Sequence, residues 1–545
     1  MRIVIIGAGF GGAYTAKYLH KILDRQHQIE IINRENYFVF QPLLPEVASG
    51  VINIQDAVTP VRLMLKDIDV RLARVIDIDK GKRCVYVSQG PDSKLIEVPF
   101  DHLVIATGLK PELSMLPGFT EHALTMKNLS DAYLLRNHVI ERLEESDSYK
   151  DEQTIAKNLC FVVGGGGFSG IETIGELQEM IHRTLRFYPH INKDQIRMVL
   201  VHSGDRILPE MGAKLSEYVR HKLEARGIEI ITNTMLTGMT ADAVELDNGK
   251  IISCKTVVST VGNSLPEMVQ NLDLPTERGR LPVDDKLRIV GCSNIWALGD
   301  VALVPNAISE FNPCPPTAQF AVRQAQCLAT NIAAEIENCP LTTFAYKPKG
   351  SLASIGDYKG VAEIRNLRIS GFIAWALWRV IYLAMFPGAI SRLRIALNWL
   401  LDYFVPRNIV HIQQHLPSST CFIRFKAGDV VIGKNQILRG LYTVVRGRLQ
   451  LEVHEEDGKV FKREILPGDH FGERTIEKKI LTTGSLTALE ESYLMFIERS
   501  DFAKLRDYLP GFGKYISSLN TIATRYSKSI DAKQARRMPG MRIRS

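Results

Sequence analysis

Short apolar runs alternate with amphipathic segments through most of the first three hundred residues. Residues 2–6 are β-branched and apolar, a glycine-rich turn follows them, and residues 13–23 have helical character. The same order of elements returns at residues 159–163 and the segment after them. Strands that alternate with helices predict parallel sheets, so the expected fold class is α/β.

The first glycine-rich turn has the spacing Gly-x-Gly-x-x-Gly of a dinucleotide-binding loop. Gly7 permits the tight turn, Gly9 lets a pyrophosphate approach the backbone, and Gly12 lets the helix pack closely on the strand. Phe10 lies inside the loop and is counted with these glycines as a cofactor-binding position. The helix N-terminus then faces the phosphate charge.

The strand after this helix ends where an acidic residue normally holds the ribose hydroxyls. Residues 29–32 lead instead to Asn33. Asparagine departs from this pattern but can still donate and accept hydrogen bonds. We therefore expect ribose recognition that is weakened rather than absent, with Arg34 or Glu35 as possible substitutes for the acid.

A second glycine-rich loop, with the same order of strand, turn and helix, follows the strand predicted at residues 159–163. Gly165, Gly167 and Gly170 precede a helical segment. Two such units in one chain predict two Rossmann-type domains, one for each of two dinucleotides. The natural pair is a flavin and a nicotinamide dinucleotide.

Two further segments resemble the flavoprotein reductases that bind two dinucleotides. Residues 104–108 end in Thr107-Gly108, and residues 294–300 end in Gly299-Asp300. In that superfamily the first glycine loop binds FAD, the second binds NAD(P)H, and the Gly-Asp aspartate contacts the ribityl-phosphate region. The resemblance also places Gly262 among the cofactor-binding positions.

Residues 36–44, with Phe-Gln-Pro-Leu-Leu, and residues 315–325, with Pro-Thr-Ala-Gln, look like type II NADH dehydrogenases. The resemblance covers residues 1 to about 410 and implies a single-subunit NADH:quinone oxidoreductase that pumps no protons. Hydride would pass from NADH to FAD, and the electrons would pass to a membrane quinone. The eight cysteines are scattered, which argues against disulfide reduction and against zinc, and no metal centre is expected.

The resemblance also implies which residues meet the acceptor. Ala318 and Gln319 match the family's quinone-pocket segment, but Arg323 stands where its second glutamine is expected, and Gln324 follows one residue later. Arg323 either hydrogen-bonds a quinone carbonyl or is a surface or ion-pair residue. The sequence leaves both roles of Arg323 open.

On the donor side, His202 occupies the position where an acid normally selects NADH. NADPH therefore stays open beside NADH. Glu172 matches a family position close to the nicotinamide, where it would orient the ring or influence quinone access. The expected catalytic residues are Glu172, Gln319 and Arg323.

An apolar run at residues 371–386 suggests a membrane contact. It is too short to span a bilayer and carries Arg379 in its middle. Residues 365–407 hold six arginines, one aspartate and three tryptophans, which favours amphipathic helices lying on an anionic membrane. The alternative is a buried core or dimer helix. The chain opens without a secretory signal, so we expect it to be cytoplasmic and bound to the inner face of the plasma membrane.

Beyond about residue 413, short apolar runs are separated by glycine turns, which predicts an antiparallel β-roll. Their order resembles the cyclic-nucleotide-binding domains. Glu473 matches the family's ribose-binding carboxylate, but Thr482 stands where the phosphate-binding arginine is expected. We therefore favour a β-roll that has lost nucleotide binding, although Arg474 leaves a cyclic nucleotide possible.

The expected architecture is thus two Rossmann-type domains, an amphipathic helical membrane anchor and a β-roll. The FAD domain covers residues 1–112 and 276–335, the NAD(P)H domain 113–275, the anchor 336–412, the β-roll 413–518 and a basic tail 519–545. We expect a homodimer and no nucleic-acid partner. Two alternatives are a soluble NAD(P)H diaphorase or flavin reductase with another acceptor, and a nucleotide-responsive redox sensor.

Overall fold

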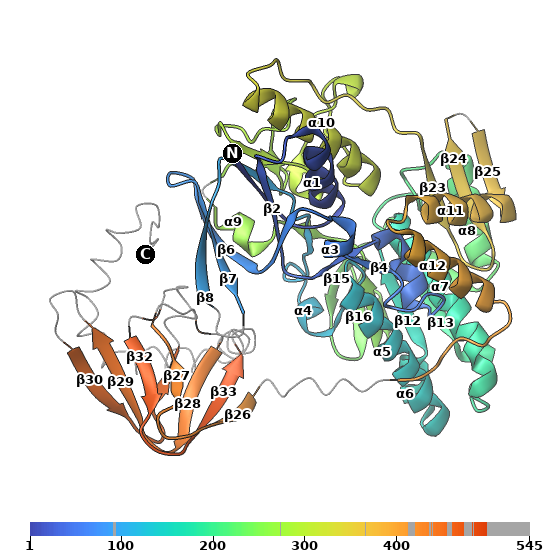
Figure 1. Ribbon diagram of the computed structural model, residues 1–545. Helices are drawn as coiled ribbons and strands as arrows, with labels where there is room; N and C mark the ends of the chain where they lie inside the picture. The colour runs from blue at the N-terminus through green and yellow to red at the C-terminus, as the bar shows by residue number, and fades with distance from the viewer. Residues whose placement is uncertain are drawn as a thin grey trace. The chain divides into compact units, whose positions relative to one another are not determined.

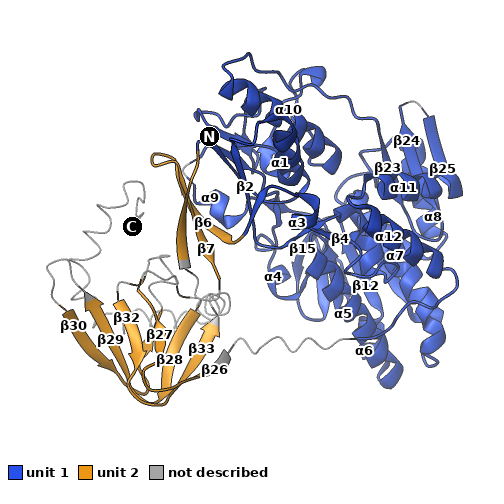
Figure 2. Cartoon of the chain, viewed as in Figure 1, with its two compact units in different colours: residues 1–71, 101–412 blue, residues 72–100, 413–545 orange. Residues whose placement is uncertain are grey.

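The computed structural model describes residues 1–498 except 91–93, 273, 366, 412–419, 435–437, 439, 455–459, 473–481 and 483. The chain forms two compact units, residues 1–71 with 101–412 and residues 72–100 with 413–545 (Figure 2). The basic tail and the predicted nucleotide contacts Glu473 and Arg474 lie outside the described residues.

The first unit contains two five-stranded sheets. The first sheet has the order β21 (Ile295–Ala297), β9 (His102–Ile105), β1 (Arg2–Ile6), β2 (Gln28–Asn33) and β5 (Asp69–Leu72). The second has the order β11 (Leu124–Thr125), β18 (Thr256–Ser259), β12 (Cys160–Gly164), β13 (Arg197–Val201) and β14 (Ile228–Ile231). Strands β21, β9, β1 and β2 run parallel in the first sheet, and all five strands run parallel in the second. The predicted α/β class is confirmed, because the central strands of both sheets run parallel and each sheet is built around a strand–glycine–helix unit.

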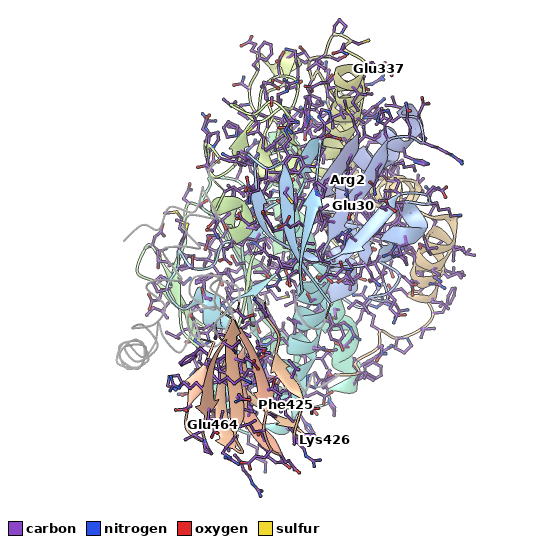
Figure 3. The ribbon with its side chains drawn as sticks, turned by 60° about the vertical axis from the view of Figure 1, so that its left-hand side comes forward. Arg2, Glu30, Glu337, Phe425, Lys426 and Glu464 are labelled. Atoms are coloured by element: carbon purple, nitrogen blue, oxygen red, sulfur yellow. The ribbon has the colours of Figure 1, made fainter. Side chains whose placement is uncertain are left out.

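Each central strand is buried on both faces, which explains its continuous apolar sequence. Residues 3–5 of β1 are fully buried, as are Val162 and Val163 of β12. Helix α1 (Phe10–Ile22) packs on α10 (Ala318–Ile336), so segments three hundred residues apart in sequence share one domain core (Figure 1). Next to the edge strand β5, buried Glu30 on β2 accepts a hydrogen bond at 2.6 Å from Arg2 on β1 (Figure 3). It also accepts one from Arg71 on β5.

Residues 350–401 form a small sheet and two helices that pack on the rest of the first unit (Figure 1). The elements are β23 (Gly350–Ser354), β24 (Gly360–Ile364), β25 (Leu367–Gly371), α11 (Phe372–Met385) and α12 (Ala389–Leu401). Within the described part of the chain, no helix combines the length and the apolar character that crossing a bilayer requires.

The second unit contains the predicted β-roll. Two antiparallel four-stranded sheets, built from strands between β26 (Thr420–Phe425) and β33 (Ser492–Glu498), enclose a core that includes Val444, Leu449 and Leu494. Thr482, which stands where the arginine was expected, donates its hydroxyl hydrogen bond to the carbonyl of Gly433 at 2.7 Å.

Two glycines allow a close approach between residues 350–401 and the rest of the first unit. A Cβ added to Gly175, on α7 (Phe168–Thr184), would lie 2.4 Å from the carbonyl oxygen of Ile355. Gly356 has a φ of +74°, and the Arg226 guanidinium bonds the carbonyls of both Ile355 and Gly175. Only glycine allows α7 to meet this turn.

We therefore expect Gly175→Ala to destabilise the protein by about 2 kcal/mol, because a methyl group would force two backbones apart. The free energy of unfolding in urea measures this effect. Gly81→Ala is the matched control, since an added Cβ there meets only an aspartate oxygen at 3.4 Å. Equal stability of the two variants would contradict the close approach.

Candidate functional site

The first glycine loop forms an open cradle at the N-terminus of α1. A Cβ on Gly12 would lie 1.9 Å from the carbonyl oxygen of Gly7, and one on Gly7 would lie 2.5 Å from that of Ala106, beside Thr107 and Gly108. A Cβ on Gly9 would meet nothing within 4 Å, and no side chain caps the helix. Free N–H groups facing open space at a helix start fit the pyrophosphate of a bound dinucleotide.

Asn33 supports this loop from the end of β2. Its Oδ1 accepts the Ala8 N–H at 3.0 Å, and its Nδ2 donates to the carbonyl of Glu35 at 2.8 Å. Arg34 is exposed beside it. The asparagine thus shapes the loop through hydrogen bonds on both ends of its amide, a role that an acidic side chain could share only in part because it donates none.

The Gly299-Asp300 turn reaches the same loop from the other side. The Leu298 side chain lies 3.2 Å from the Cβ position of Gly11, and the Asp300 carboxylate is 3.2 Å from Lys127 Nζ. The Gly299 N–H donates to Gln324 Oε1 at 2.8 Å. The first glycine loop and the Gly-Asp turn, which the family resemblance assigned to the same cofactor, therefore come together.

Gln324 has a role that the sequence pattern did not indicate. It is 2 % exposed and holds the Gly299 turn, whereas Gln319 lies half-buried in the first turn of α10, directly after Ala318. Arg323 turns toward the loop before β23, with its guanidinium 5.6 Å from the ring centroid of Tyr346. The sequence did offer a signal for this role, since Gln324 lies one residue beyond the position where the second glutamine was expected.

The second glycine loop repeats the geometry of the first. A Cβ on Gly170 would lie 1.8 Å from the carbonyl oxygen of Gly165, and Gly167 caps α7 without a side-chain hydrogen bond. Gly165 in turn packs on Thr260, two residues before Gly262, whose φ is +76°. This loop fits a second dinucleotide.

His202 lies against this second loop. The Gly166 N–H donates to its Nδ1 at 3.1 Å, so Nδ1 is the nitrogen of the ring that accepts from the loop. Arg206 donates to the carbonyl of Pro209 at 2.9 Å. The expected donor-selecting position is therefore an imidazole ring that packs on the glycine turn.

Three buried glutamates lie between α7 and α2 (Leu44–Ala48). Glu172 and Glu176 are one turn apart on α7, and Glu46 is on α2; they are 8 %, 5 % and 1 % exposed. The Ser49 hydroxyl donates to Glu176 Oε2 at 2.9 Å and so joins the two helices. We call Glu46, Glu172 and Glu176 the carboxyl cluster.

Burial sets the protonation of this cluster. Loss of solvent raises the pKa of Glu172 to about 8, against the hydrogen bonds that lower it, and raises the pKa of Glu176 to about 8. Burial also raises the pKa of Glu46, although the Arg379 cation opposes it. At neutral pH Glu172 and Glu176 therefore favour their protonated forms.

Residues 354–399 supply hydrogen-bond donors to the cluster. The Ser354 N–H and the Trp378 indole N–H each donate to Glu172 Oε1 at 3.1 Å. The Trp399 indole N–H donates to Glu46 Oε2 at 2.7 Å, and Arg379 is 3.4 Å from Glu46 Oε1.

The interpretation of the tryptophans as membrane-interface residues is wrong. Trp375, Trp378 and Trp399 are 5 %, 2 % and 7 % exposed. The Arg379 guanidinium stacks between Trp375 and Trp399, 4.2 and 4.8 Å from their centroids. These side chains face the interior of the first unit, where Trp378, Trp399 and Arg379 are partners of the buried glutamates.

Aromatic contacts connect the cluster with the first glycine loop. Phe10 contacts Phe40 at 5.5 Å between ring centroids, Phe40 contacts Tyr382 at 6.0 Å, and Tyr382 contacts Trp378 at 4.7 Å. These ring contacts lead from the first glycine loop to Trp378, which donates to Glu172, and Glu172 itself lies in the second turn of the helix that begins at the second glycine loop.

Three family models match the chain. Residues 1–325 match the pyridine nucleotide-disulphide oxidoreductase family, residues 349–408 the NDH2 C-terminal domain, and residues 422–508 the cyclic nucleotide-binding domain. The last match agrees with the predicted β-roll.

Curated relatives and solved structures point the same way. The chain is 31 % identical to a type II NADH:quinone oxidoreductase of Mycobacterium tuberculosis over 74 % of this chain and 89 % of the relative. It is 30 % identical to a demethylphylloquinone reductase of Synechocystis over 73 % of this chain and 95 % of that protein. Its fold is similar to that of NDH2 from Plasmodium falciparum, solved with NADH, at a TM-score of 0.69 and 20 % sequence identity. The match covers 75 % of this chain and 99 % of the other.

We expect two matched glycine variants to separate the two cradles. Gly12→Ala should lose most of the bound flavin, because its Cβ would collide with Gly7. Gly170→Ala should keep the flavin but weaken NADH binding by about tenfold or more, because only the second loop is distorted. Flavin absorbance of the purified proteins and NADH titration measure the two effects. Loss of flavin in both variants would contradict separate cradles.

Proposed function

Because the chain belongs to the type II NADH:quinone oxidoreductases of the pyridine nucleotide-disulphide oxidoreductase family, we propose that its first cradle holds FAD, its second holds NADH, and its carboxyl cluster serves quinone reduction. The chain is an FAD-dependent NADH:quinone oxidoreductase. FAD, when bound, accepts hydride from NADH and passes the electrons to the quinone.

The observation that carries this function is the pair of glycine cradles in one compact unit, each at the start of a helix that no side chain caps. Each cradle presents free backbone N–H groups of a helix start to a pyrophosphate. The protein's contribution is then to bind and orient the two dinucleotides and to manage protons.

Proton balance gives the carboxyl cluster its role. Oxidation of NADH supplies two electrons and one proton, whereas a quinone needs two electrons and two protons to become a quinol. One further proton must come from solvent through the protein. Glu172 is suited to hold it, because its pKa is raised to about 8 and it lies in the second turn of the helix that starts at the nucleotide loop.

Anaerobic mixing tests the function directly. NADH should bleach the flavin of the purified protein, and a short-chain quinone should restore the colour. If NADH bleaches the flavin but quinones do not restore the colour, the protein oxidises NADH and quinone is rejected as its acceptor. The same experiment with NADPH measures how strongly the His202 position selects the donor.

We also propose that the outer face of α11 and α12 rests on an anionic membrane. The inner faces carry the buried tryptophans, whereas exposed Arg365, Arg392 and Arg394 accompany a continuous set of exposed apolar side chains. That apolar set comprises Phe372, Ile373, Val380, Met385, Ile390, Leu393, Leu397, Leu400, Leu401 and Phe404. Short helices with this division lie in the membrane interface, with arginines toward anionic headgroups.

Leu393→Glu combined with Leu397→Glu should weaken binding to anionic lipid vesicles by about a hundredfold, since each leucine contributes roughly 1.5 kcal/mol or more. Vesicle sedimentation at low and high salt measures the binding. Ile251→Glu is the control, because Ile251 is exposed to the same degree as Leu393, at 63 % and 62 %, but lies on the nucleotide domain. Unchanged sedimentation of the double variant would reject this face as the contact.

A further inference from the structure

We propose that Trp378 is a positioning residue for proton delivery: together with the Ser354 amide it restricts Glu172 Oε1 to accepting hydrogen bonds, so that Oε2 carries the proton given to the quinone. This inference rests on the proposed function, because it assigns an oxygen atom and a partner to the acid proposed there.

The geometry of the two donors carries the inference. The Ser354 and Trp378 N–H groups are both 3.1 Å from the same oxygen, Oε1. Neither group can accept a hydrogen bond, so a proton on Oε1 would point at another donor. Among the described residues, no hydrogen bond reaches Oε2. The exchangeable proton therefore belongs on Oε2.

The two donors come from different elements, which makes the orientation rigid. Ser354 is the last residue of β23, which pairs with β24. Trp378 is 2 % exposed, and its ring lies 4.7 Å from that of Tyr382 and 6.5 Å from that of Trp399. The indole therefore has little freedom to follow a different Glu172 rotamer.

Several other groups act on the charge of Glu172. Glu176 on the same helix and Glu46 on α2 repel its ionised form, and Tyr382 on α11 is close enough for Glu172 to raise the pKa of its phenol. Arg379 and Arg407 offset part of the negative charge at Glu46 and Glu176. The indole hydrogen bond opposes the repulsion, because it stabilises the ionised form and lowers the pKa of Glu172.

The full-length, flavin-loaded protein is assayed for NADH:quinone turnover between about pH 6 and about pH 10. Because Glu172 gives its proton from the protonated form, activity should fall as the pH rises through about 8, the raised pKa of Glu172. Trp378→Phe removes a hydrogen bond that favours ionisation, so this alkaline limb should move up by about one pH unit. If the substitution only damaged packing, kcat would fall but the alkaline limb of the pH–activity profile would stay at the same pH.

Trp399→Phe is the matched control, because the same change removes a donor to Glu46 and not to Glu172. It should produce no upward shift of the limb. Glu172→Gln should remove the limb itself while NADH still bleaches the flavin. An unshifted limb in Trp378→Phe, or an equal upward shift in both tryptophan variants, would overturn the inference.

Infrared difference spectra give a readout that does not require turnover. The carboxyl band that Glu172→Gln abolishes should lie at the low frequency of a C=O that accepts two hydrogen bonds, and Trp378→Phe should raise it. A wild-type band at the frequency of a free carboxyl group would overturn the inference even if Trp378→Phe did not fold. Absence of quinone-dependent turnover in the wild type would instead reject the proposed function.

Discussion

The burial of three glutamates between α2 and α7 is the constraint on which the arrangement of the site depends. An ionised carboxylate in apolar surroundings costs several kcal/mol unless it is paired, so each group must be protonated or given donors. Glu46 is paired with Arg379 and Trp399, and Glu172 receives two N–H donors from residues 354–378. The region after residue 349 therefore completes the site.

The same demand explains how α11 and α12 are oriented. A helix with apolar residues on all sides has no composition-based preference for which face turns inward. Here the faces with the indole N–H groups of Trp378 and Trp399 and with Arg379 turn toward the glutamates, which leaves most of the aliphatic side chains, with arginines among them, outside. Farther along, buried Arg407 bonds Asp402 and Glu179 and fastens the end of this region to α7.

Both glycine loops could be predicted because their information is local. A strand, a turn that only glycine can make, and a helix start lie within about a dozen residues, and Gly7 and Gly12 meet in the structure for the steric reason that the spacing implies. The β-roll could be predicted for the same reason, since its strands and glycine turns follow one another in sequence. Asn33 was placed correctly at the end of β2, but its hydrogen bonds to the loop required coordinates.

The sequence by itself determined the two dinucleotide folds, their order and the family, because hydrophobic period and glycine spacing act over short distances. Only the tertiary structure decided the surroundings of Glu172. Its donors, Ser354 and Trp378, are 182 and 206 residues away in the chain, and the pKa of its carboxyl depends on solvent that these segments exclude. Composition indicated aromatic and basic residues near residue 380, but which of them turn inward is a property of packing, where unpartnered buried charge costs more than exposed apolar surface.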